Sequence, residues 1–89
     1  MPKPDIDTYL TFWASLDETD RMDFTAEALE IARAEKLNLL NADMWETLGW
    51  VFADRASSPA DRDVAVTGVC LAAAMFAQAE HVRNPGPVS

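Results

Sequence analysis

The stretch of sequence that decides the fold is residues 64–77, VAVTGVCLAAAMFA, in which Thr67 is the only polar side chain. Its alanines, leucine and methionine are strong helix formers, so we expect a helix here. Because apolar side chains then occupy every side of that helix, none of its faces can be solvated. We therefore expect it to be buried all round, either at the centre of the domain or against a second chain.

The residues on either side of this stretch mark where the helix begins and ends. Ser58-Pro59-Ala60-Asp61 supplies a serine cap, a proline at the first helical position and a carboxylate at the third, which together predict a helix start. The helix is expected to continue to about Val82. Asn84-Pro85-Gly86-Pro87 then stops it, and residues 84–89 are expected to form a flexible tail.

Three further helices are predicted upstream, over residues 6–16, 18–36 and 43–56. Asp5 can cap the first of them and Asp17 the second, because a short carboxylate side chain accepts hydrogen bonds from the free N–H groups of a first helical turn. Asp43 can pair with Glu46 as a variant of the capping box at the start of the third. Residues 1–4 are expected to be a loose leader.

Apolar residues at helical spacing predict which face of each helix is buried. The principal stripe of the second helix consists of Met22, Ala26, Leu29 and Ala32. The inner face of the third consists of Met44, Trp45, Leu48, Val51 and Phe52. The predicted fold is all-α, a compact single domain (residues 1–89) of about four helices, with the C-terminal helix central or at a dimer interface. The first helix is short and the last long, so an ideal bundle with parallel axes is not expected.

Charge and cysteine content exclude several classes of function. The net charge is −8, from 15 acidic and 7 basic residues, so phosphate backbones and anionic lipid surfaces repel the chain. No run approaches the roughly 18 to 20 apolar residues that a membrane-spanning helix needs, and residues 64–77 come closest. Cys70 is the single cysteine, and no export signal opens the sequence. We expect a cytoplasmic protein that binds neither nucleic acid nor a membrane.

Few residues are available for catalytic or metal chemistry. His81 is the only histidine, and it lies near the end of the last helix, where a cation suits the helix dipole. Cys70 lies in the apolar run, with no neighbouring cation to activate it as a nucleophile. Glu27 and Glu30 have an i, i+3 spacing, but no Glu-x-x-His pair accompanies them. We therefore expect no enzyme activity, no cofactor and no metal.

One face of the second helix is almost entirely acidic. It carries four carboxylates at spacings of 3, 4 and 3 residues, which we call the acidic stripe: Asp20, Asp23, Glu27 and Glu30. At about 100° per residue they occupy an arc of about 80° and extend along about 15 Å of the axis. A solvated helix face is the ordinary explanation. The nearly single sign of the charge favours attraction to a basic partner.

Three large side chains next to polar surface are candidate anchors for a partner. Phe24 and Ile31 lie seven residues apart beside the acidic stripe, away from Met22 and Leu29. Either the second helix is buried on two sides, or these two side chains meet a partner. Trp50 falls on the polar side of the third helix, where it is either an interface anchor or packs against a terminal segment.

The last helix offers a second candidate interface. Three short helices enclose a fourth only imperfectly, and large exposed apolar patches are uncommon on soluble monomers. We therefore predict that another helix or another chain covers Val66, Val69, Ala73 and Phe76, which lie away from the side formed by Val64, Gly68, Leu71 and Met75. The predicted dimer interface consists of Val66, Gly68, Val69, Ala72, Ala73 and Phe76. The alternative is a monomer with this helix at its centre.

Two functions are consistent with these features. The first is a small protein–protein interaction module, an inhibitor or sequestering protein that docks on a basic surface through the acidic stripe, with Phe24, Ile31 and Trp50 as anchors. In size and acidity the chain is similar to phage-encoded inhibitors such as anti-CRISPR proteins and to toxin-neutralising immunity proteins, a likeness of composition alone. The alternative is a structural homodimer assembled through the C-terminal helix.

Overall fold

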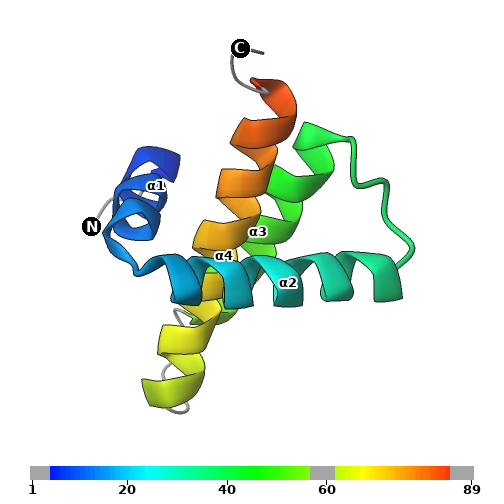
Figure 1. Cartoon of the computed structure of the whole chain (residues 1–89). Coiled ribbons are helices and arrows are strands. Elements are labelled where there is room, and N and C mark those ends of the chain that lie inside the picture. The colour runs from blue at the N-terminus through cyan, green and yellow to red at the C-terminus, as the bar shows by residue number, and fades with distance from the viewer. Residues whose placement is uncertain (1–4, 57–61, 85–89) are drawn as a thin grey trace.

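Helices make up nearly all of the described chain. A computed structural model describes residues 5–56 and 62–84, and it contains no strand within them. The helices are α1 (Ile6–Ser15), α2 (Glu18–Ala34), α3 (Ala42–Ala56) and α4 (Arg62–Arg83). Figure 1 shows α3 and α4 side by side and antiparallel, with α2 lying across them and α1 on the opposite flank from the α2–α3 connection. The prediction of an all-α domain of about four helices without parallel axes is confirmed.

The α3–α4 pair packs closely through glycine and alanine. A Cβ atom built on Gly68 would lie 3.0 Å from the Cβ of Ala56, so the absent side chain lets the two backbones approach. A Cβ atom built on Gly49 would lie 2.8 Å from a ring carbon of Phe76, so the Phe76 ring packs directly against the α3 backbone. The two helices therefore approach closely at Gly68, and this contact is made within one chain.

α2 reaches the core through alanines. Ala28 and Ala32 are completely buried, together with Ala74 of α4, whereas Met22 is 66% exposed. The predicted stripe of α2 is therefore wrong at Met22 and at Ala26, which is also exposed. Small side chains allow α2 to cross α4 at short distance, and the resulting contact turns the larger Met22 side chain outward.

α4 occupies the centre of the molecule, because α1, α2 and α3 all pack against it. Ala73 and Phe76, which the sequence required to be covered, are 0% and 1% exposed. Val66 is 53% exposed, contrary to that prediction, whereas Val69 is half-buried. The start of α4 extends past α2 in Figure 1. The predicted helix start at residues 58–61 lies outside the described residues.

The starts of α1 and α2 are stabilised in different ways. Asp5 caps α1 as predicted: its Oδ1 accepts hydrogen bonds from the backbone N–H and the hydroxyl of Thr8, both at 2.9 Å. Asp17 precedes α2 but accepts no side-chain capping bond. The junction is held instead by Arg21, whose guanidinium donates to the carbonyls of Leu16 at 2.8 Å and Ala14 at 3.2 Å.

The end of α2 and its connection to α3 are set by backbone conformation and one buried indole. The helix ends at Ala34 rather than at Lys36, because Lys36 adopts a left-handed φ of 56° that a right-handed helix cannot contain. The connection then passes over the completely buried Trp45, whose Nε1–H donates to the carbonyl of Leu39 at 2.8 Å. Trp45 is therefore a core residue, as predicted.

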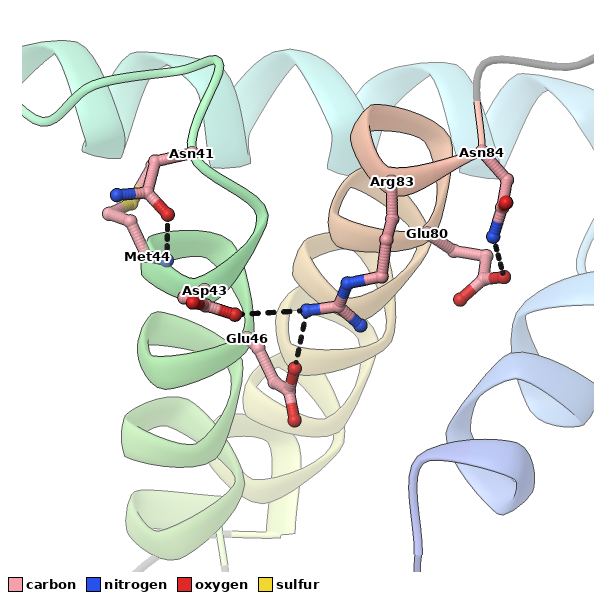
Figure 2. Close-up of polar contacts among 7 residues, drawn as sticks. All are labelled: Asn41, Asp43, Met44, Glu46, Glu80, Arg83 and Asn84. Atoms are coloured by element: carbon pink, nitrogen blue, oxygen red, sulfur yellow. Dashed lines mark hydrogen bonds and ion pairs between the residues drawn. The ribbon is translucent and has the colours of Figure 1, made fainter.

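The start of α3 differs from the predicted capping box. Asn41 caps the helix, since its Oδ1 accepts a hydrogen bond from the Met44 N–H at 3.2 Å. Asp43 and Glu46 instead reach across to the last turn of α4, where Arg83 donates to them at 3.3 Å and 2.8 Å (Figure 2). A cation at the C-terminal end of α4 thus binds two carboxylates on the first turns of α3, which ties the ends of the two helices together.

One stretch of α4 satisfies the length and hydropathy of a membrane-spanning helix. Ala65–Arg83 has a mean hydropathy of 1.3, so the sequence-based expectation that no run approaches this length was too strict. The central helix of a bundle meets the same criterion, and residues 70–76 of α4 are buried by the other helices. We regard the apolarity of α4 as a property of a core helix.

A candidate interaction surface between α2 and α3

Trp50 belongs to an aromatic cluster inside the fold. Its ring centroid lies 4.9 Å from that of Phe76 and 6.1 Å from that of Tyr9, and the Tyr9 and Phe76 centroids are 5.1 Å apart. These edge-to-face and tilted contacts join α1, α3 and α4. Of the two predicted roles for Trp50, packing against the N-terminal segment is the one that the structure shows, and the half-buried indole lies on the α1 side of α3.

Phe24 and Ile31 pack against the core from α2. Both are half-buried against the cluster that contains Ala28 and Ala32. α2 is therefore buried over a broader face than its predicted stripe, which answers the alternative left open by the sequence. Ile31 has a second contact surface, because it also borders a hollow on the outside of the protein.

The acidic stripe is completely on the surface. Its four carboxylate residues are exposed, and no ion pair involves any of them within residues 5–56 and 62–84. Arg21, the nearest cation in the sequence, is engaged with backbone carbonyls at the α1–α2 junction. The negative charge of the stripe is therefore not neutralised by the described part of the chain.

A groove lies beside the stripe, between α2 and α3. It encloses about 560 Å³ and is lined by apolar and polar side chains from the C-terminal part of α2, the connection and α3: Ile31, Glu35, Leu37, Asp43, Met44, Thr47, Leu48, Val51, Phe52 and Arg55. A second hollow of about 400 Å³ continues along α3 and shares Phe52 and Arg55 with the first. The groove exists because α2 and α3 both dock on α4 and splay apart from each other.

The apolar face of α3 that lines the groove was predicted to be its inner face. The structure buries Trp45 of this face, together with Gly49 and Ala53, and half-buries Met44, Leu48 and Phe52 against the core, so that only Val51, 41% exposed, contradicts the prediction. α3 thus has two apolar stripes, and the one that contains Gly49 and Ala53 packs on α4. Helical spacing indicates the stripe that lines the groove, because Met44, Leu48, Val51 and Phe52 follow an i, i+4, i+7, i+8 pattern.

The acidic stripe and the groove share an edge on α2. Residues four positions apart lie about 40° apart around a helix, so Glu27, Ile31 and Glu35 form one ridge along α2. Ile31 and Glu35 line the groove, and Glu27 belongs to the stripe. A partner seated in the groove would therefore meet negative charge along its α2 side. Trp50 lies about 100° around α3 from Val51 and so faces away from this surface.

Most of the predicted dimer interface is enclosed within one chain. Ala72, Ala73 and Phe76 are buried by the other helices, and Gly68 is packed against Ala56. Ala72, Ala73 and Phe76 therefore cannot line a dimer interface while the fold is intact. Of the predicted set, Val66 is exposed, and Gly68 and Val69 are half-buried.

The two reactive side chains that the sequence singles out, Cys70 and His81, lie on different turns of α4. Cys70 is buried, and burial followed by the negative charge of Asp20 raises the pKa of its thiol above the usual 9.0. His81 is exposed at the end of α4. Within the described residues, no group of three or more His, Cys, Asp or Glu side chains is arranged to hold a metal ion.

Comparison with protein-family models, with curated proteins and with solved structures finds no significant match. The function is therefore inferred from the chain's own surface.

Proposed function

We propose that this protein is an interaction module that acts by binding a basic protein surface, through the face formed by the acidic stripe and the α2–α3 groove. The observation that carries the proposal is a row of four exposed carboxylates, none of them in an ion pair with the described residues, that runs along α2 to Glu27 at the edge of an apolar groove. The role that follows is that of an inhibitor or sequestering protein, which needs a binding face and no chemistry.

The two parts of this face contribute differently to binding. Exposed charges of one sign steer an oppositely charged partner and accelerate its association, but each adds little affinity because water and salt screen it. Apolar side chains that leave water on binding supply most of the stability of a complex. A partner that used the stripe alone would bind weakly, whereas one that also filled the groove would gain both contributions.

The experiment is affinity capture with charge reversal on the stripe. The tagged protein and the variant Asp23→Lys with Glu27→Lys are used to capture proteins from a lysate of the native host, and captured proteins are identified by mass spectrometry. We expect the variant to lose the partner while its far-UV circular dichroism stays unchanged, because both side chains are exposed.

The control variant changes the same net charge elsewhere. Asp7→Lys with Glu80→Lys also alters two exposed carboxylates, but these lie on α1 and at the end of α4. It is expected to capture the partner as the wild type does. Equal capture by all three proteins would show that the stripe is a solvated face without a binding role.

A structural homodimer is the second candidate, and the exposed Val66 together with the half-buried Val69 favours it. Both lie in the first half of α4, whose start extends past α2 in Figure 1. Sedimentation equilibrium at micromolar concentration separates the two candidates. A dimer that Val66→Glu dissociates would support the structural role, and a strict monomer would exclude it.

A further inference from the structure

The α2–α3 groove has the form of a seat for one further helix. Its floor is a helical face of α3, with apolar side chains at the i, i+4 and i+7 positions Met44, Leu48 and Val51. Ridges of side chains on one helix pack best into the grooves of another. From Met44 to Arg55 the floor extends over about 16 Å, which matches about three turns of a partner helix.

We propose that this groove binds a basic amphipathic helix of the partner protein, with apolar residues of the helix on α3 and lysines or arginines facing α2. The inference rests on the proposed function and specifies which structural element of the basic partner is recognised. Recognition through apolar anchors at i, i+3, i+4 and i+7 is a common way to bind a helix in a groove.

The charges around the groove favour a basic occupant. Glu35 lines it, and Glu27 follows on the same ridge of α2, whereas Asp43, the other carboxylate in the lining, is paired with Arg83. Arg55, the one cation among the described lining residues, already lies over the ring of Phe52, 5.5 Å from its centroid. An acidic helix would meet like charge along the whole α2 side, whereas a basic one would meet carboxylates there.

A second copy of the chain fits the groove less well. In a two-fold dimer the same face meets itself, so one hollow would lie against another and neither would be filled. Each copy carries a net charge of −8, and the pairing would bring the two acidic stripes to the same interface. Shape and charge therefore both favour a foreign basic helix over self-association at this face.

The test uses a synthetic helical peptide of about 14 residues, with leucines at i, i+3, i+4 and i+7 spacing and lysines elsewhere. Two control peptides have glutamate in place of lysine, or the same composition in shuffled order. Binding is measured by fluorescence anisotropy. We expect the basic amphipathic peptide to bind at least roughly tenfold more tightly than either control.

A matched pair of variants locates the binding site. Val51→Glu places a charge on the groove floor, and Val66→Glu makes the same change on an exposed valine of α4 that does not line the groove. We expect Val51→Glu to weaken binding roughly tenfold and Val66→Glu to leave it unchanged. The proposal is overturned if Val51→Glu and Val66→Glu bind the amphipathic peptide equally well, or if the shuffled peptide binds as tightly as the amphipathic one. It is also overturned if the amphipathic peptide does not bind at a concentration of about 1 mM.

A measurement on the unmodified protein covers the case in which Val51→Glu fails to fold. Methyl NMR spectra are recorded with and without the peptide. The Met44 methyl signal should shift, because it lines the groove, whereas the Met22 methyl signal should not, since Met22 is exposed on another part of α2. A shift of Met22 alone would also contradict the proposal.

Failure of this inference is distinguishable from failure of the proposed function. If the shuffled basic peptide binds as well as the amphipathic one and Asp23→Lys with Glu27→Lys abolishes that binding, the stripe binds basic chains without the groove. If stripe reversal has no effect on capture of the host partner, the proposed function itself is wrong. Self-association that Val51→Glu dissociates would assign the groove to a second copy.

Discussion

Gly49 is the position at which a single added methyl group most directly tests the packing of the core. A Cβ at Gly49 would lie 2.8 Å from Cε1, 2.9 Å from Cδ1 and 3.1 Å from Cζ of Phe76. Carbon atoms in good contact are about 3.5–4.0 Å apart, so the ring would have to move by about 0.7 Å or more. The ring is 1% exposed and lies between Tyr9 and Trp50, so it has little room to move.

The expected effect of Gly49→Ala is the difference of two terms. Overpacking of a core costs about 1–3 kcal/mol, and replacing glycine by alanine inside a helix contributes about 1 kcal/mol in the opposite direction. We expect a net destabilisation of about 1 kcal/mol, which lowers the melting temperature by about 4–8 °C in a domain of this size. Urea unfolding followed by circular dichroism measures the free energy directly.

A double-mutant cycle with Phe76→Leu isolates the contact. Leucine lacks Cε1, the ring atom that lies closest to the added methyl group, and also Cζ. In the Phe76→Leu background, Gly49→Ala should therefore be stabilising by up to about 1 kcal/mol, so that the two changes are coupled by about 2 kcal/mol. Additivity within about 0.5 kcal/mol would show that Gly49 and Phe76 do not touch and that this part of the core is packed differently.

Two further predictions follow from the ionisable groups. The backbone N–H of Thr8, and then its hydroxyl, lower the pKa of Asp5 below 3.8, so the cap stabilises α1 above that pH and its contribution is lost as the pH falls through the lowered pKa. Asp5→Asn keeps a capping oxygen that does not titrate. Below pH 3.8 the melting temperature of this variant should therefore fall less than that of the wild type. Parallel curves of melting temperature against pH for the two proteins would contradict the capping role of Asp5. The pKa of Cys70 is raised, so stability should decline as the pH rises above 9.0, and the native thiol should react with Ellman's reagent roughly 100-fold more slowly than in guanidinium chloride. Complete labelling of the native protein within minutes would show that α4 opens readily.

Of the two parts of the candidate site, the sequence predicts the acidic stripe but not the groove. The acidic stripe follows from residue type and helical spacing, and the structure leaves all four of its residues exposed, as a row of carboxylates on one helix face requires. The groove was not predictable, although Met44, Leu48 and Val51 were identified as an apolar face. A spacing pattern shows that a face is apolar, and it does not show whether another element of the chain covers it.

The anchor residues illustrate the same limit. Trp50 was assigned to a polar face from its neighbours in α3, but the short helix α1 supplies Tyr9 to cover it. Phe24 and Ile31 lie away from the predicted apolar stripe of α2, because that stripe includes Met22, which the structure leaves exposed. In both cases the contact partner lies on another helix, at a distance in sequence that periodicity does not reach.

The sequence by itself determined that this protein is all-helical, approximately where its helices begin and end, and that α4 must be buried, because helix propensity, capping and periodic apolarity act over a few neighbouring residues. Tertiary structure decided which of several apolar faces became the core. The closest contacts with α4 are made by faces that carry small side chains, Ala28 and Ala32 on α2 and Gly49 and Ala53 on α3, since these allow close approach and complete packing. The face of α3 with Met44, Leu48, Val51 and Phe52 is only partly covered, and it lines the groove beside the acidic stripe.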